Sequence, residues 1–377
     1  MTPSQDQSGR WQGKRAFVVS RKDKESETVT SFILAPEDGL PLAAFKPGQF
    51  LSFKLDIPGH DKPVPRSYTI SSSPASALLS DGAHYRLSIK REPAPKDKPD
   101  LPPGLSSNFF HDHVAVGSCV QVGAPAGDFF LDDTEDGPVV LLSGGVGLTP
   151  LISMLDHLVD QGSSRPTWFI HGVQNGAEHA FGAHVRELAQ VHDHITTHVV
   201  YTEPGPGDSK GRDYDATGFI SIPMLESLSV GTDADFYLCG PPPFMKALFN
   251  ALLDWGVDEA RIHYEFFGPA TVLKDGPKEQ PKAAVAALAA AAGVTVTFKR
   301  SNISVPWDPA HETILDLAEA NGISPAFSCR AGVCHTCIVD LLEGEIEYVV
   351  DDAYQPEEVG KVLICSSAPK TSVVIDV

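Results

Sequence analysis

Three of the six cysteines in this 377-residue chain stand within nine residues, in the segment CRAGVCHTC (329–337). The spacing is Cys329-x4-Cys334-x2-Cys337, and Cys365 follows after 27 intervening residues. Thiolates this close together can bind zinc, hold an iron–sulfur cluster, form a disulfide or act as a redox-active pair. The spacing and the neighbouring residues discriminate among these possibilities.

Zinc and disulfides fit the cysteine segment poorly. Zinc knuckles and ribbons usually pair two short CxxC or CxH elements, whereas this segment has one CxxC and an outlying Cys329. Three thiols on one loop of a long chain differ from the spread cysteines of a secreted scaffold and favour a reducing compartment. A Rieske centre needs two histidines, each paired with a cysteine, and His335 directly beside Cys334 does not give that pattern.

The spacing C-x4-C-x2-C…C is that of plant-type 2Fe–2S ferredoxins. Ala331 and Gly332 are small, which lets the backbone wrap closely around a cluster. The last 85 residues resemble such a ferredoxin in the segments TILDLAEANGISPAFSCRAGVCHTC, LLEGEIEY and VLICSSAP. The resemblance implies an α+β β-grasp fold and four cluster ligands, Cys329, Cys334, Cys337 and Cys365. His335 stands where the family pattern most often has glycine.

The composition is that of a globular, turn-rich protein with more than one domain. Hydrophobic residues make up 42% of the chain and charged residues 21%, with 32 Gly and 31 Pro. The longest apolar run, near 283–292, is mostly alanine and about half as long as a bilayer span. The N-terminus has no charged-then-apolar leader. We therefore expect a cytoplasmic protein that does not bind membranes.

The charge of the chain is strongly acidic. A formal net charge of −20 argues against nucleic acid as a partner and favours a partner with a positive surface. Residues 343–358 carry seven carboxylates and no Lys or Arg. This acidic stretch fits a solvated face and a docking surface equally well.

Two hydrophobic patterns divide the chain before the cysteine segment. Short alternating segments between Gly, Pro, Asp or Ser turns predict an antiparallel β-barrel over 15–135, with strands in 15–23, 28–36, 49–57, 66–73, 84–92 and 118–125. From 136 to 273, continuous apolar strands alternate with helical segments, which predicts an α/β domain with a parallel sheet. We expect a flexible tail over 1–14, a linker over 274–292 and the ferredoxin-like domain over 293–377.

A cluster of this type takes one electron at a time, whereas NAD(P)H gives up a hydride, so the upstream domains are expected to hold a flavin. In RSYT, strand alternation places Arg66 and Tyr68 on one face and Ser67 and Thr69 on the other, which offers a cation, a ring and hydroxyl groups. In GLSSNFF (104–110), Ser107 and free N–H groups at a helix start suit a pyrophosphate. Each motif alone also fits an ordinary strand or helix cap.

Two glycine-containing turns follow apolar strands and open helices. They are SGGVGLTP (143–150) and YLCGPPPFM (237–245), and glycine there permits close approach of a phosphate or a nicotinamide. The second turn places Cys239 at the carboxyl end of a parallel strand, where ligands usually bind. Buried packing is the more common role of a lone cysteine.

In series, the motifs resemble the ferredoxin–NADP reductase superfamily, and closely the reductase module of flavohaemoglobins, over about residues 15–272. The resemblance rests on GQFLSFKL, RSYTIS, YRLSIKRE, GLSSNFF, LLSGGVGLTPLISML, FYLCGPPPFM and IHYEFFGP. It implies FAD, with FMN as the alternative, bound by Phe50, Arg66, Ser67, Tyr68, Thr69 and Ser107. It also implies a nicotinamide dinucleotide bound by Gly144, Gly145, Val146, Gly147, Leu148, Thr149, Gly240 and Pro241.

The same resemblance implies roles in hydride transfer. Thr69 is expected beside the flavin N5 and Cys239 near the hydride-donating carbon, with Glu265 and Phe267 over the flavin. Thr69 replaces the usual serine but keeps the hydroxyl group. Because no globin-like segment precedes residue 15, we expect no haem and no nitric oxide dioxygenation.

The combined prediction is an NAD(P)H-dependent electron-transfer reductase of three domains. Electrons would pass from NAD(P)H to FAD, to the 2Fe–2S cluster and then to a protein acceptor, as in the reductase components of Rieske-type oxygenases. Acceptors of another kind are a hybrid-cluster protein, a desaturase or a quinone, and the C-terminal domain could instead be a redox sensor or docking module. The choice between NADH and NADPH stays open, with Lys210 and Arg212 as candidate phosphate-binding residues. The added segment PAPKDKPDLPP (93–103) fits a tolerated surface insertion or a partner contact.

Overall fold

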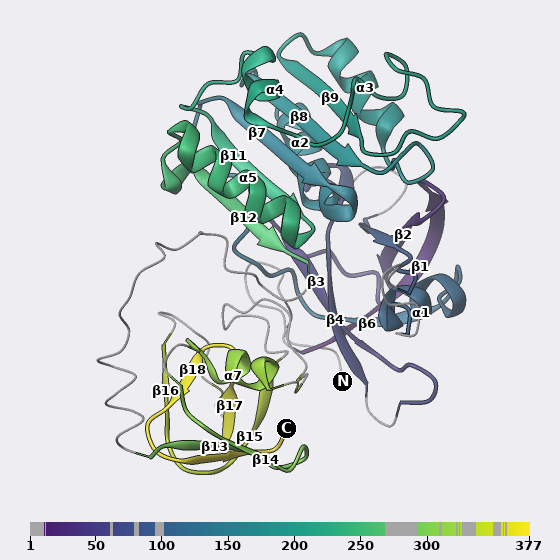
Figure 1. The fold of residues 1–377 in the computed structure, drawn as a ribbon. Coiled ribbons are helices and arrows are strands. Elements are labelled where there is room, and N and C mark those ends of the chain that lie inside the picture. Colours follow the sequence, from purple (N-terminus) through teal and green to yellow (C-terminus); the bar gives the residue numbers. More distant parts are fainter. Residues whose placement is uncertain are drawn as a thin grey trace. The chain divides into compact units, whose positions relative to one another are not determined.

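The computed structural model describes residues 11, 13–60, 63–78, 83–94, 102–267, 293–308, 311–321, 323, 325, 337–349, 356, 358 and 360–377. Its internal contacts divide the chain into two units, Met1–Lys274 and Asp275–Val377. Both units are drawn in Figure 1. The predicted linker over 274–292 and most of the cysteine segment lie outside the described residues.

The first half of the N-terminal unit is an antiparallel sheet of six strands. They are β1 (Arg15–Lys24), β2 (Val29–Pro36), β3 (Phe50–Leu55), β4 (Val64–Thr69), β5 (Tyr85–Lys90) and β6 (Cys119–Val122), in the order β4-β3-β6-β1-β2-β5. The two edge strands meet, because Ile70 bridges to Leu87 and the Ser71 N–H donates to the Arg86 carbonyl over 2.8 Å. The predicted antiparallel barrel is therefore confirmed.

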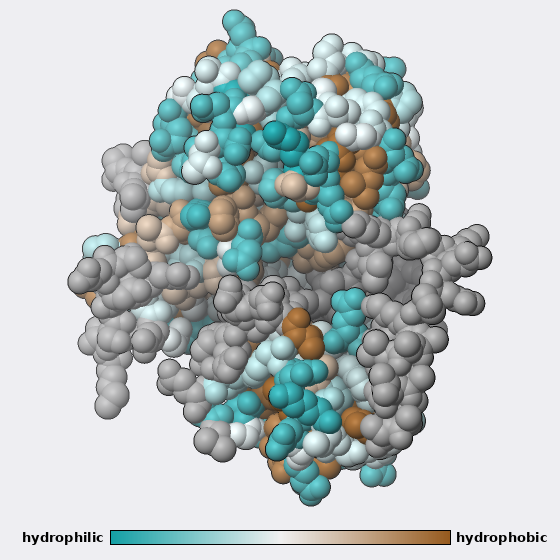
Figure 2. Space-filling model, turned by 90° about the vertical axis from the view of Figure 1, so that its left-hand side faces the viewer, coloured by the Kyte–Doolittle hydropathy of each residue, from teal (hydrophilic) through white to brown (hydrophobic). Residues whose placement is uncertain are grey.

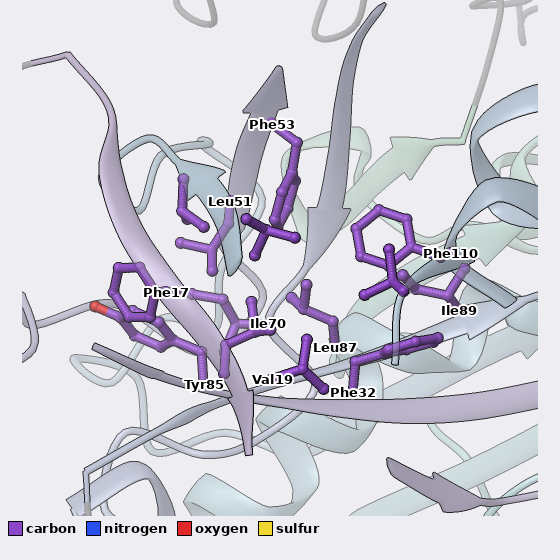
Figure 3. Close-up of a cluster of buried hydrophobic side chains, with 14 of the residues drawn as sticks. Phe17, Val19, Phe32, Leu51, Phe53, Ile70, Tyr85, Leu87, Ile89 and Phe110 are labelled. Carbon is purple, nitrogen blue, oxygen red and sulfur yellow. The ribbon is translucent and has the colours of Figure 1, made fainter. Parts of the chain in front are cut away.

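Large side chains fill the inside of this barrel. The alternation predicted from sequence places one side of each strand inward, as in β1, where Phe17 and Val19 are fully buried. Figure 3 shows these residues converging with Phe32, Phe53 and others from facing strands. Helix α1 (Leu105–His113) covers one side through Phe110, whose ring lies 5.3 Å from that of Phe32. The core thus fixes α1 and the strands relative to one another.

The second half of the N-terminal unit is a parallel sheet with helices on both faces. Its strands are β7 (Val139–Gly144), β8 (Thr167–Val173), β9 (Ile195–Tyr201), β10 (Ala216–Thr217), β11 (Asp235–Gly240) and β12 (Ile262–Phe266), in the order β10-β9-β8-β7-β11-β12. The helices are α2 (Leu148–Asp160), α3 (Gly182–Val191), α4 (Ile222–Ser227) and α5 (Pro242–Trp255), with short turns η2 (Gly145–Gly147) and η3 (Glu259–Arg261). The strand order reverses between β7 and β11, the place where such sheets bind ligands.

The central strands are apolar on both faces because helices cover both. In β7, Val139 and Leu141 pack with α2, whereas Val140 and Leu142 pack with α5. This burial explains the continuous apolar run in the sequence. It also leaves the carboxyl ends of the strands as the place where polar side chains and turns gather.

Hydrogen bonds and close packing join the barrel to helix α2. The Ser153 hydroxyl donates to the Ser72 carbonyl over 2.7 Å, and Ser73 hydrogen-bonds Asp160. Gly48, before β3, lies so close to Met154 that an added Cβ would come within 2.7 Å of its Cε. The chain directly after the RSYT strand therefore packs against helix α2, which begins right after the first glycine turn.

The described residues of the C-terminal unit form a small mixed sheet, a separate strand pair and the helix α7. The main sheet has the order β14-β13-β19-β15-β17, from β13 (Thr295–Phe298), β14 (Ile303–Pro306), β15 (Ile338–Glu343), β17 (Lys361–Leu363) and β19 (Val373–Ile375), with β16 (Ile346–Tyr348) and β18 (Ser367–Pro369) paired separately. Its central pair β13–β19 is parallel and the outer pairs are antiparallel. Helix α7 (Ile314–Ala320) packs on it after a capping box formed by Thr313 and Asp316. The multidomain fold class predicted from sequence is confirmed.

Among the helices that the structure describes, none combines the length and the apolar character needed to cross a bilayer. The described residues on the face drawn in Figure 2 are mostly hydrophilic, with smaller hydrophobic areas between them.

Candidate flavin, nicotinamide and iron–sulfur sites

The predicted flavin residues lie on two paired strands. Phe50 of β3 stands directly opposite Thr69 of β4 in the antiparallel register. Thr69 is buried and Arg66 is exposed, while Ser67 and Tyr68 are half-buried. The Ser67 hydroxyl oxygen is buried without a hydrogen-bond partner in the described structure, and an orphaned polar atom of this kind suits a ligand that supplies one.

Tyr68 ties the flavin strand to helix α1. Its ring lies 5.1 Å from that of Phe110 and 5.9 Å from that of Phe53, and burial raises the pKa of its hydroxyl group. The loop after β6 covers Phe50, because a Cβ on Gly127 of that loop would come within 2.9 Å of the Phe50 ring. Phe50 therefore supports the strand in this arrangement, and its contact with a flavin stays a prediction.

Ser107 holds the first turn of α1 to the end of β5. Its hydroxyl group donates to the Gly104 carbonyl over 3.1 Å and accepts from the Glu92 N–H over 3.3 Å. Asn108 adds a 2.8 Å bond to the Glu92 carbonyl. The Ser107 side chain thus shapes the helix start, and the pyrophosphate role predicted for it depends on the N–H groups of this turn.

The two glycine turns of the parallel sheet pack backbone against backbone. A Cβ on Gly147 would collide with the carbonyl of Cys239, and a Cβ on Gly240 would come within 3.0 Å of the Gly144 nitrogen. Gly145 has a φ of +53° and open space around its Cα. Only glycine permits this approach, so the turns predicted to bind the nicotinamide meet at the switch point of the sheet.

Four polar side chains form a row across the carboxyl ends of neighbouring strands. The register places His171, Ser143, Cys239 and Glu265 side by side on β8, β7, β11 and β12. The Ser143 hydroxyl and His171 Nδ1 are 2.8 Å apart, and Cys239 is fully buried. Sequence reasoning proposed Cys239 and Glu265 as site residues and missed Ser143 and His171.

Glu265 is the most perturbed acid of the row. Burial, and then the charge of Asp128, raise the pKa of its carboxyl group to about 8. Burial and the neighbouring Glu265 likewise raise the pKa of the Cys239 thiol. At neutral pH Glu265 is therefore mostly protonated and can donate a hydrogen bond, and Cys239 is a neutral thiol.

The residues predicted to bind the flavin and the nicotinamide both connect to helix α2. This helix begins at Leu148, directly after the first glycine turn, and one turn later Ser153 binds the carbonyl of Ser72. Ser72 lies three residues after Thr69, and Asp128, whose charge acts on Glu265, directly follows Gly127, the residue that lies against the Phe50 ring. The two predicted sets therefore belong to one region of the N-terminal unit. Phe267, 39% exposed, follows Glu265 in the same strand end.

Two of the four predicted cluster ligands lie in the described structure, at one end of a strand pair. In the antiparallel ladder, Ile338 of β15 pairs with Leu363 of β17, so Cys337 and Cys365 flank the same end. The Ile364 N–H donates to the Cys337 carbonyl over 3.3 Å, and the two cysteines are only 1% and 3% exposed. Two sheltered thiols at one strand end suit a 2Fe–2S cluster. Cys329, Cys334 and His335 lie outside the described residues.

Sequence reasoning missed the residues whose role depends on sheet order. Ser143 and His171 are adjacent only because β7 and β8 pair in parallel, and Asp128 approaches Glu265 through the loop after β6. A strand-by-strand alignment of the carboxyl ends would have found the first pair. Nothing in the local sequence marks Asp128.

Two family models match the chain. One, described as an oxidoreductase NAD-binding domain, covers residues 141–249, and the other, a 2Fe-2S iron-sulfur cluster binding domain, covers 296–370. Among curated proteins, the flavohemoprotein of Halalkalibacterium halodurans is 43% identical over 265 residues, and that of Rhodopirellula baltica 43% over 266. Each match covers 70% of this chain, and the chain spans 62–63% of the length of these relatives.

Solved structures give the same picture. The flavohem-like FAD/NAD binding domain of nitric oxide dioxygenase from Vibrio cholerae is 37% identical with a TM-score of 0.59, and the match covers 68% of this chain and all of that one. Phthalate dioxygenase reductase is 21% identical with a TM-score of 0.55. The match covers 97% of this chain and 98% of that one, so the likeness of fold extends to both units. The ferredoxin reductase in carbazole 1,9a-dioxygenase matches 68% of this chain and 69% of its own, at 21% identity and a TM-score of 0.54.

Proposed function

Because the chain belongs to the ferredoxin–NADP reductase superfamily and joins a flavohaemoglobin-like FAD/NAD module to a 2Fe–2S ferredoxin domain, we propose that it supplies electrons from NAD(P)H to the terminal component of a Rieske-type mono- or dioxygenase. The chain is an NAD(P)H-dependent flavin and iron–sulfur oxidoreductase, and electron transfer is its chemistry. The identity of the acceptor is the proposed part. It is supported by the likeness in fold to the reductase of phthalate dioxygenase over nearly the full length of both chains.

When bound, FAD accepts a hydride and releases electrons singly, and a 2Fe–2S cluster accepts them one at a time. The residues of this chain position the reactants. The glycine turns at 144–147 and 239–241 allow close approach of the nicotinamide, and helix α2 fixes them relative to Ser72 and hence to the strand of Thr69. Hydride transfer then needs orientation and no general base.

The neighbouring polar row suits a hydride-transfer site. The neutral Cys239 thiol and the protonated Glu265 place no negative charge beside the position proposed for the nicotinamide. A negative charge at this place would change the stability of the oxidised, positively charged nicotinamide ring relative to the reduced ring. Thr69, Cys239, Glu265 and Phe267 therefore stay the proposed residues of the transfer step.

The observation that carries the proposal is the joining of the two domain types in one chain. Its test is stopped-flow reduction of the full-length, FAD- and cluster-loaded protein with NADH and NADPH. The flavin absorbance should bleach first and the cluster absorbance next, both within the turnover time of an oxygenase-coupled assay. A cluster that stays oxidised while ferricyanide reduction runs at full speed would contradict the relay and favour a sensor or docking role.

Cys337→Ser gives the matched variant. Because Cys337 is buried at the ladder end beside Cys365, its loss should remove cluster absorbance while the FAD spectrum and ferricyanide reduction persist. Cys119→Ser, at an exposed thiol of the barrel, is the control and should leave both chromophores intact. Retained transfer to an oxygenase in Cys337→Ser would show that the cluster is bypassed.

A further inference from the structure

The loops after β8 and β9 lie at the same edge of the parallel sheet as the glycine turns. β8 adjoins β7, and β9 adjoins β8, so their carboxyl ends continue the edge away from the switch point. In doubly wound sheets the dinucleotide extends along this edge, and an acid there accepts the ribose 2′-hydroxyl while an arginine accommodates a 2′-phosphate. The charges of loops 174–181 and 202–215 therefore bear on the choice between NADH and NADPH.

The two arginines of this edge are held by carboxylates. The Arg212 guanidinium forms contacts of 2.7 to 3.1 Å with both oxygens of Asp213, and its Nη2 also donates to the Gly207 carbonyl over 3.0 Å. Arg186 of α3 has its Nη2 buried, 3.5 Å from Asp215. Arg212 cannot receive a phosphate without giving up its carboxylate, and the Nη2 of Arg186, which has no hydrogen-bond partner in the described structure, is closed off from solvent.

Two further carboxylates are fixed at the strand ends. Glu203, just beyond β9, accepts from the Gln174 amide over 2.6 Å, and Gln174 follows β8 directly. Asp208 accepts from the N–H groups of Gly176 and Gly205 over 3.1 and 2.7 Å, which ties the two loops together. The loop 202–215 holds four carboxylates against Lys210 and Arg212.

The histidines beneath these loops add no positive charge at neutral pH. Burial, and then Arg186, lower the pKa of His179 to about 4, and its Nδ1 lies 2.9 Å from the Tyr201 hydroxyl. Burial lowers the pKa of His171 well below its usual range and lowers that of His198 as well. Lys210 is then the one exposed basic side chain of the described loop that no carboxylate is shown to bind.

We propose that the chain uses NADH and discriminates against NADPH through the carboxylates of loop 202–215, with Asp213 holding Arg212 away from a phosphate and Glu203 positioned for a ribose hydroxyl. The inference rests on the proposed reductase function and makes it more specific. A 2′-phosphate carries up to two negative charges and would meet this acidic loop, whereas a neutral 2′-hydroxyl can donate to a carboxylate.

The test compares kcat/KM for NADH and NADPH in ferricyanide reduction by the full-length, cofactor-loaded protein. The native chain should favour NADH by about tenfold or more, because repulsion between like charges costs several RT. Asp213→Asn keeps an oxygen for the Ser209 N–H, which now binds Asp213 over 2.7 Å, but frees Arg212. Its NADPH/NADH ratio of kcat/KM should rise about threefold or more, and Glu203→Gln should move the ratio in the same direction.

Asp233→Asn is the matched control, since it removes the same charge before β11, at the opposite edge of the sheet. Its ratio should equal that of the native chain. A native preference for NADPH, or ratios in Asp213→Asn and Glu203→Gln that match the control, overturns the inference and leaves the reductase function standing. Failure of both dinucleotides to reduce the flavin overturns the reductase function itself, and the preference with it.

Discussion

At the scale of single residues, Glu265 is the side chain with the clearest electrostatic consequence. A carboxyl group whose folded pKa is about 8 binds a proton that the unfolded chain has lost above about pH 4.5. Between these values the native state binds more protons than the unfolded state, so stability falls as the pH rises. The protonated form is the one that the fold favours.

Glu265→Gln should remove this pH dependence. Because glutamine imitates the protonated acid, the variant is expected to gain roughly 1–3 kcal/mol over the native chain at pH 8 and little at pH 5. The measurement is the thermal midpoint of the N-terminal unit in the FAD-loaded protein between pH 5 and 8.5. Parallel curves for the two proteins would show that Glu265 is ionised when folded.

Gly147 offers a second test at this scale. Gly147→Ala should damage the junction of the two glycine turns, because its Cβ would collide with the Cys239 carbonyl, and overpacking of this kind costs about 1–3 kcal/mol. We expect slower flavin reduction by NADH and a lower thermal midpoint.

Gly172→Ala is the control for Gly147. Gly172 lies in the neighbouring strand, paired with Gly144, and a Cβ there meets its nearest atoms at 3.6 Å, which is ordinary contact. Its flavin reduction should stay near the native rate. Equal effects in the two variants would mean that the close approach of the turns is unimportant.

At the scale of elements, α2 is the connection between barrel and sheet. Asp156 of this helix binds Arg86 of β5 over 3.2 Å and His184 of α3 over 2.6 Å, and this bond is the main reason why the pKa of His184 is raised. A raised histidine pKa adds stability below the unfolded value near 6.5, and this stability is lost as the pH rises through the folded value. The contacts of Asp156 with Arg86 and His184 should therefore hold α2, α3 and the barrel together more firmly in mild acid.

Asp156→Asn should loosen this connection. Loss of a half-buried charged hydrogen bond costs about 1–3 kcal/mol, and the loss should be larger at pH 6 than at pH 8. Asp112→Asn, which breaks the exposed pair between Asp112 and Arg91, should cost clearly less than Asp156→Asn at either pH. Urea unfolding of the FAD-loaded protein measures both losses of stability. Equal losses in the two variants would show that Asp156 does not contribute more to stability than the exposed Asp112.

The elements themselves were largely predictable. The alternating segment 15–23 is β1 (Arg15–Lys24), the segment 84–92 contains β5 (Tyr85–Lys90), and 118–125 contains β6 (Cys119–Val122). Short elements such as α4 and β10 were not predicted, because six or two residues carry too little periodicity. The predicted domain boundaries stay predictions, and the linker lies outside the described residues.

The site was predictable in its parts but not in its assembly. Glycine turns and RSYT have local signatures, so their residues were found. The row from His171 to Glu265 depends on the pairing of β8, β7, β11 and β12, and the bond between Ser153 and Ser72 joins residues 81 apart in sequence. Such long-range pairings arise from the packed core, which no single segment encodes.

At the scale of the whole molecule, the acidic stretch 343–358 bears on the acceptor. Glu343, Glu345 and Glu347 are exposed, and they begin only six residues after Cys337, a predicted cluster ligand. Asp351 and Asp352 lie outside the described residues. An acidic surface near the last electron carrier favours a basic acceptor and speeds its approach at low salt.

Reversing four of these charges should slow reduction of a basic acceptor. The variant changes Glu345, Glu347, Asp351 and Asp352 to Lys. We expect it to reduce cytochrome c several-fold more slowly than the native chain at about 20 mM salt, with a rate that depends less on salt. Flavin reduction by NADH should be unaffected. An equal loss in a variant with Glu226→Lys and Asp254→Lys, on the N-terminal unit, would assign the effect to net charge alone.

The pairing of the first and last barrel strands has a consequence for synthesis of the chain. Arg15 pairs with Val122, and the Trp11 indole donates to the Val122 carbonyl across 111 residues of sequence. At roughly 5–20 residues per second, a ribosome needs on the order of 5–20 seconds to make this interval. During that time one edge of β1 has no partner strand, so the newly made barrel is open to chaperones and to other nascent chains until β6 emerges.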